Sequence, residues 1–137
     1  MTAVADIVRD ALQILGVVDP NEAPEAEDEA TAIRALNLMC RAWEVQGMTL
    51  GWQDVSGPGE ELPAPPEAEE AIAYNLALRL RPRYGTELSA DIVQQANDGL
   101  ATLSAQITAN TFARTEFPDL PAGVGSRFGS WRDGFFQ

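Results

Sequence analysis

The sequence predicts an all-α fold: a small four-helix bundle followed by an extended, aromatic-rich C-terminal tail. Two observations support this prediction. Apolar residues recur at helical spacing in four segments that glycine and proline separate, and this pattern stops at Thr111. The chain has 137 residues, of which 45% are hydrophobic, so one domain with a single core is expected.

The first helix is predicted over residues 2–15. Its apolar residues follow the spacing of one helical face: Val4, Ile7, Val8, Ala11, Leu12 and Leu15. Thr2 is a candidate N-cap residue. Gly16 stands where a helix commonly ends in a left-handed residue.

An acidic segment, residues 21–30, leads into the second helix, which is expected to end near Gln46 before Gly47. We interpret its acids as the start of that helix, because negative charge suits the positive end of the helix dipole. A metal cage is the alternative, but the segment lacks the glycine and the regular oxygen spacing of a calcium loop. The inner face is predicted to consist of Ile33, Leu36, Cys40 and Trp43, with Cys40 as a small core residue.

Residues 47–66 are predicted to form an ordered loop, anchored by Leu50 and Trp52. A third helix follows from Glu67 to about Arg81, with Pro66 suited to its first turn and Pro82 expected to break it. Residues 72–78 are apolar almost all round, which is typical of a helix that is contacted from two sides.

The fourth helix is predicted to start after Ser89 and to end near Ala109 or Asn110. Its apolar stripe contains Ile92 or Val93, Ala96, Leu100, Leu103 and Ile107. The chain is therefore divided into a helical body, residues 1–110, and a docking extension, residues 111–137. Gly99 interrupts this helix at a cost of about 1 kcal/mol relative to alanine.

The C-terminal extension contains six of the ten aromatic residues of the chain among several glycines and prolines. Aromatic and arginine side chains commonly anchor protein interfaces. We therefore predict that this segment docks on another protein subunit, and a return of the segment onto its own core is the alternative. The predicted docking residues are Arg127, Phe128, Trp131, Arg132, Phe135 and Phe136.

The composition argues against an enzyme. The chain has no histidine and no lysine, so the commonest general base and a phosphate-loop lysine are both absent. Glu67 and Glu70 share a helix face, and paired carboxylates can cleave a glycosidic bond, yet such residues at a helix start are usually solvated. No catalytic residue, metal site or cofactor is predicted. No membrane segment or signal peptide is expected, which indicates synthesis in the cytoplasm.

Two stretches carry a resemblance to a known family. The first runs from Leu15-Gly16-Val17 through residues 35–39 to Trp43 and Gly47-Met48. The second contains Ile72-Ala73-Tyr74-Asn75-Leu76-Ala77, followed by Pro82-Arg83-Tyr84-Gly85. Over roughly residues 3–110 the chain resembles the head-to-tail adaptors of tailed phages, which include packaged-DNA stabilisation or tail accessory factors. Related adaptors occur in phage-like gene transfer agents.

This resemblance implies a helical bundle that forms a ring, usually of twelve copies, between the capsid portal and the tail or stopper protein. It places the protein at the head–tail junction of the particle and implies that double-stranded DNA passes through the ring without specific binding. The net charge of −12 agrees with a channel that does not hold phosphates. The candidate acids for the wall of this channel are Glu22, Glu25, Glu27, Asp28, Glu29, Glu60 and Glu61. A small acidic protein-binding module, or a regulator that mimics DNA, is the alternative function.

Overall fold

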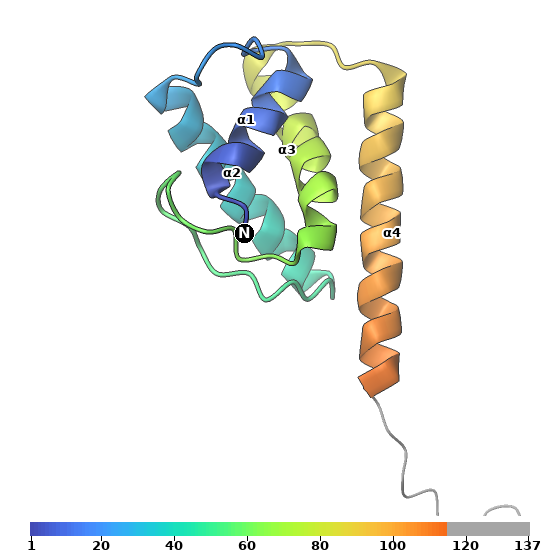
Figure 1. The fold of residues 1–137 in the computed structure, drawn as a ribbon. Coiled ribbons are helices and arrows are strands. Elements are labelled where there is room, and N and C mark those ends of the chain that lie inside the picture. Colours follow the sequence, from blue (N-terminus) through green and yellow to red (C-terminus); the bar gives the residue numbers. More distant parts are fainter. Residues whose placement is uncertain (115–137) are drawn as a thin grey trace, which may run out of the picture.

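A computed structural model of the chain describes residues 1–114, with side chains described as far as residue 110. This part contains four α-helices: α1 (Val4–Leu15), α2 (Ala26–Val45), α3 (Glu69–Tyr84) and α4 (Ala90–Arg114). A single 3-10 turn, η1 (Pro66–Ala68), leads into α3 (Figure 1). Within residues 1–114 the only extended pairing is an isolated bridge between Ala3 and Glu61, so the predicted all-α fold is confirmed there. The predicted aromatic-rich tail lies outside the described residues.

Helix α3 is the central element of the body. It contacts α1, α2 and α4, and its residues Ile72, Leu76 and Leu80 are completely buried. The large fully buried side chains of the other helices pack around it: Val4, Val8, Leu12, Leu36, Met39 and Cys40. The prediction of a helix that is contacted from two sides is therefore confirmed.

Helix α1 begins without the side-chain cap that the sequence suggested. Its N-cap is Ala3, and no side chain caps the helix, so the prediction for Thr2 was wrong. Backbone carbonyls of the loop between α2 and η1 take this role instead. The N–H groups of Val4 and Ala5 donate to the carbonyl oxygens of Glu60 and Pro58, each at 2.9 Å. The other end is as predicted, with Gly16 in the left-handed region at φ 82°.

Helix α2 ends at Val45, and Gly47 turns the chain with φ 94°, close to the predicted end. Its predicted inner face is confirmed, because Ile33, Leu36, Cys40 and Trp43 are all buried. The loop that follows is anchored by half-buried Leu50 and Trp52, which pack against the core as predicted.

Pro82 does not break the third helix, contrary to the prediction. It is exposed and lies in the last turn of α3, where it removes one backbone N–H close to a helix end that already leaves carbonyls unpaired. The helix continues to Tyr84, whose hydroxyl donates to Asp28 on α2 at 2.8 Å. Gly85 then ends the helix in the left-handed conformation, with φ 62°.

Helix α4 lies along α3 and continues past the rest of the body (Figure 1). It begins after Ser89 as predicted, but it runs to Arg114, beyond the predicted end at Ala109 or Asn110. Its predicted apolar stripe packs on the body, with Ala96 and Leu103 buried and Leu100 and Ile107 partly buried.

Candidate functional site

The docking residues predicted in the C-terminal tail lie outside the described residues. These residues are Arg127, Phe128, Trp131, Arg132, Phe135 and Phe136. What the structure describes is the helix that leads to them. The far end of α4, at Arg114, stands clear of the three-helix body (Figure 1). The segment that contains the predicted docking residues thus begins at a point distant from the core.

The acids predicted to line a channel fall into two groups. The first group surrounds the start of α2, where Glu22, Glu25 and Glu27 are exposed and Glu29 is half-buried. Asp28 differs from them because it accepts the hydrogen bond from Tyr84. Burial, followed by this bond to Asp28 and its charge, raises the pKa of Tyr84 to about 12. Asp28 therefore ties α2 to α3 and is not a free surface charge.

The second group, Glu60 and Glu61, lies beside the start of α1. Both residues are exposed, and the backbone of Glu61 forms the bridge with Ala3. The carboxylate of Glu60 accepts hydrogen bonds from the hydroxyl and the backbone N–H of Ser56, which lower its pKa. The two groups of acids lie near opposite ends of α1, and they do not form one continuous wall on a single copy.

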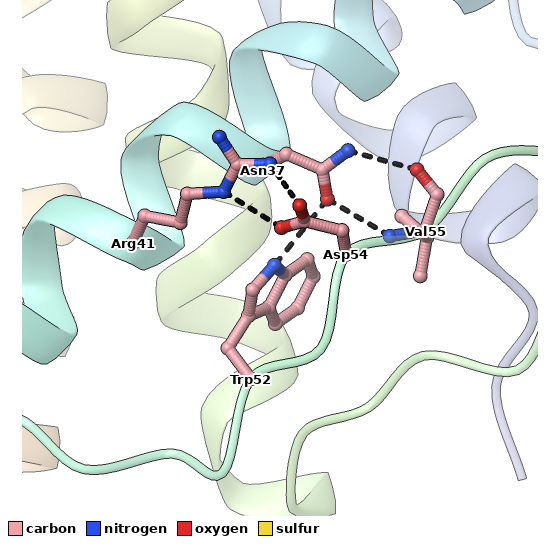
Figure 2. A network of polar contacts seen from close by, with 5 residues as sticks. All are labelled: Asn37, Arg41, Trp52, Asp54 and Val55. Carbon is pink, nitrogen blue, oxygen red and sulfur yellow. Dashed lines mark hydrogen bonds and ion pairs between the residues drawn. The ribbon is translucent and has the colours of Figure 1, made fainter.

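A polar network fixes the loop after α2 to that helix (Figure 2). The Asn37 side chain donates to the carbonyl of Val55 at 2.8 Å and accepts from the backbone N–H of Val55 at 3.0 Å. The same amide oxygen accepts a bond from the indole Nε1 of Trp52 at 3.3 Å. The Glu44 carboxylate accepts from the backbone N–H of Trp52 at 2.8 Å. The loop is therefore held in one conformation by side chains of α2.

An ion pair at the surface completes this network. The Arg41 guanidinium donates to both carboxylate oxygens of Asp54, and the bond from Nε is 2.7 Å long (Figure 2). The pair is about half exposed, so it adds little to stability, but it neutralises Arg41. The hydrogen bond from Arg41 lowers the pKa of Asp54.

A groove between α1 and α3 is a site that the sequence did not predict. It has a volume of about 450 Å³. We name it the acidic groove, and its defining residues are Asp10, Ile14, Glu69, Glu70 and Tyr74. The residue of the sequence that could have indicated this groove is Ile14, an apolar residue beside the main apolar stripe of the first helix. A groove with an apolar floor and a carboxylate rim is suited to contact a protein surface that carries arginine or lysine.

Asp10 is the most perturbed carboxylate of this groove. Partial burial raises its pKa, the charges of Asp6 and Glu69 raise it further, and Arg9 acts in the opposite direction. The carboxylates of the groove thus repel one another, and no arginine or lysine lines the groove. A cation from outside would relieve this repulsion.

Glu67 and Glu70 line a second, smaller groove of about 290 Å³ between α3 and α4. Both side chains are exposed at the start of α3, as expected for solvated residues of a helix start. Within residues 1–114 no group of three or more histidine, cysteine or acidic side chains is placed to hold a metal ion. No helix of this part is long and apolar enough to span a membrane.

Cys40 occupies the core, as predicted. Its side chain is fully buried on α2, and burial raises the pKa of the thiol to about 12. Because the thiolate is the reactive form, Cys40 is unreactive in the folded chain.

Comparison with known families gives the context for these surfaces. A sequence model of the P22 tail accessory factor family matches residues 1–136. The chain belongs to this family. The match spans the helical body and nearly all of the C-terminal segment, so the tail accessory factor family includes both parts of the chain. Membership supports a structural role in a phage particle. The resemblance stated from the sequence is confirmed at the level of the family.

Proposed function

We propose that the chain is a head-to-tail adaptor of a phage or of a phage-like gene transfer agent. Copies of it, twelve in the ring that the family resemblance implies, join the capsid portal to the tail or stopper protein. Double-stranded DNA passes through the ring without specific binding. Family membership supports the role in the virion.

One structural observation supports the connector role in particular. The extensive contacts of α4 with other helices are all with α3. The end of α4 extends past the body (Figure 1). The last described residue of α4, Arg114, therefore lies beyond the three-helix core. A ring of such subunits would present twelve copies of the segment after Arg114 to one partner, and repeated weak contacts between two rings act together.

The test of this proposal is deletion of residues 124–137 in the otherwise complete chain. We expect a soluble protein with unchanged helix content that no longer binds the portal complex of its particle. Trp131→Ala and Phe135→Ala should weaken the same binding, because one aromatic anchor is commonly worth about 2 kcal/mol or more. Gln137→Ala, at the end of the same segment, is the matched control. Binding is measured by co-sedimentation with purified portals.

Normal assembly of the truncated protein on portals would contradict the proposed role of the tail. The helical body would then have to contain the portal-binding surface. Absence of the full chain from the head–tail junction of the intact particle, seen by electron microscopy, would contradict the adaptor function as a whole.

The proposed passage of DNA is tested through the acids at the start of α2. Replacing exposed Glu25 and Glu27 with arginine should create binding to duplex DNA that weakens steeply as salt rises, because arginine–phosphate contacts release counterions. Fluorescence anisotropy with a labelled duplex measures this binding. The same charge change at exposed Glu87 and Asp91 is the control. Equal binding by both double variants would show that the acids near α2 do not face the DNA.

A further inference from the structure

We propose that neighbouring copies of the chain bind head to tail, with an exposed stripe of α2 on one copy seated in the acidic groove of the next. The stripe consists of Arg34, Leu38, Arg41 and Val45. The inference rests on the proposed ring and names the two surfaces that build it.

The stripe is an exposed surface of two apolar and two arginine side chains. Its four residues are spaced by four, three and four positions, so they line one face of α2. Buried Leu36, Met39 and Trp43 lie on the opposite face. Leu38 and Val45 are 48% and 88% exposed, and apart from Met1 they are the exposed large hydrophobic side chains of residues 1–110. Burying them against another copy would remove apolar surface from water.

The stripe and the acidic groove face away from each other. Helix α2 contacts both α1 and α3 and covers one side of that pair. The acidic groove lies between α1 and α3, and no residue of α2 lines it, so it opens on the other side. Two different surfaces on opposite sides of a subunit produce head-to-tail contacts, which close into a ring when the rotation between copies is suitable.

Charge complementarity supports this pairing. Arg34 is exposed and has no hydrogen bond or ion pair among the described residues, and Arg41 is neutralised by Asp54. The groove offers Asp10, Glu69 and Glu70, and no arginine or lysine lines it, although Arg9 acts on Asp10 from outside the lining. In a chain with a net charge of −12, most pairs of identical faces repel each other. Arg34 opposite the groove replaces that repulsion with attraction.

The floor of the groove also fits the apolar part of the stripe. Ile14 and Tyr74 are half-buried, and Ala73 beside them is 5% exposed. These side chains would meet Leu38 and Val45, while the carboxylates at the rim would meet Arg34. A competing occupant is the chain's own segment 115–137, which carries Arg127 and Arg132 beside aromatic residues. The experiment below separates the two.

The test is a charge exchange in the full chain, followed by sedimentation velocity over a range of concentrations. Arg34→Glu should abolish self-association, and so should Glu69→Arg combined with Glu70→Arg. The chain that carries all three substitutions should associate again, because its stripe and groove are once more opposite in charge. Arg83→Glu, an equal charge change at the exposed end of α3, is the matched control and should associate as the unaltered chain does. Far-UV circular dichroism checks that each variant keeps its helices.

Three results would overturn the inference. The first is an unaltered chain that stays monomeric at about 1 mM, where even a very weak contact would be half-occupied. The second is unchanged association of the Arg34→Glu chain, or a triple variant that remains monomeric. The third is loss of association on Arg127→Glu with Arg132→Glu alone, which would assign the groove to the C-terminal segment. Association through the stripe by a chain that is missing from the head–tail junction would instead overturn the proposed function and leave this inference standing.

Discussion

Asn75 is the buried polar residue of the core, and its hydrogen bonds explain its position. Its side chain is 8% exposed and donates to the carbonyl of Ala71 in its own helix at 2.8 Å. It also donates to the carbonyl of Ala96 on α4 at 3.0 Å. The sequence indicated that Asn75 lies on a helix contacted from two sides, where an unpaired amide would be costly. It could not show that the partner belongs to α4, because that depends on how two helices cross.

Removing this amide tests how strongly it joins α3 to α4. We expect Asn75→Ala to lower the free energy of unfolding by about 1–3 kcal/mol, the usual effect of losing a buried hydrogen-bonded group. Urea denaturation measures the change. Asn97→Ala, at an exposed position of α4, is the control and should have little effect. Equal stability of the two variants would mean that the bond to Ala96 contributes nothing.

Asp10 is a residue whose charge opposes folding. Its raised pKa means that the folded chain binds the proton more tightly than the unfolded chain does. The resulting stabilisation is fully present below the ordinary pKa of 3.8 and is lost as the pH rises through the folded value. At neutral pH the ionised side chain therefore destabilises the fold.

Asp10→Asn should accordingly raise the free energy of unfolding at neutral pH. This gain should shrink as the pH falls through the folded pKa of Asp10 and should be lost below 3.8. Urea denaturation at several pH values measures both parts of the prediction. Asp19→Asn, at an exposed position after α1, is the control. A gain that does not depend on pH would show that the effect comes from packing and not from the charge.

At the level of the elements, the crossing of α3 and α4 depends on Gly99. A Cβ atom added at this position would lie 3.3 Å from Cα and 3.4 Å from Cβ of Ala71. From the sequence alone, Gly99 is only a local cost to its helix. The structure shows that the missing side chain lets the two helices approach closely, and this cannot be deduced from one helix alone.

Gly99→Val should therefore push α4 away from α3 and lower the free energy of unfolding by about 1–3 kcal/mol. Gly99→Ala should change stability little, because its better helix propensity of about 1 kcal/mol offsets the tight contact. Ala101→Val, at an exposed position of α4, is the control for the cost of a branched residue in a helix. Thermal unfolding followed by circular dichroism ranks the stability of the unaltered chain and the three variants. If the Gly99→Val variant were as stable as the Ala101→Val control, the close crossing of α3 and α4 would be contradicted.

The periodicity of apolar residues predicted the four helices and their inner faces, because burial against one core imposes a period of 3.6 residues. Ends were predicted less well where tertiary contacts decide them. Tyr84 and Asp28 hold the last turn of α3 past Pro82, and a distant loop replaces the expected cap at Thr2. The acidic groove was missed because its rim combines residues from α1 and α3, and neither helix alone shows a motif.

At the scale of the whole molecule, the charged groups can be placed on the helices. The acids singled out above form three groups: one at the start of α2, one beside the start of α1 and one at the rim of the acidic groove. Arg34, an exposed arginine, lies further along α2. Helix α4 runs along α3, and its end extends past the body (Figure 1). The acids proposed to meet DNA and the stripe proposed to meet a neighbouring copy both lie on α2, whereas the acidic groove lies between α1 and α3.

The loop that caps α1 has a consequence for how the chain folds. The first backbone N–H groups of α1 donate to carbonyls of residues 58 and 60, and the N–H of Leu62 donates to the carbonyl of Thr2 in return. The earliest helix in the sequence therefore cannot reach its final form until the chain beyond α2 has emerged and closed over it. Such a long closure is slow compared with the formation of a helix turn. A nascent chain halted after α2 would carry a first helix with a frayed start, and its amide hydrogens there would exchange with solvent until residues 57–62 arrived.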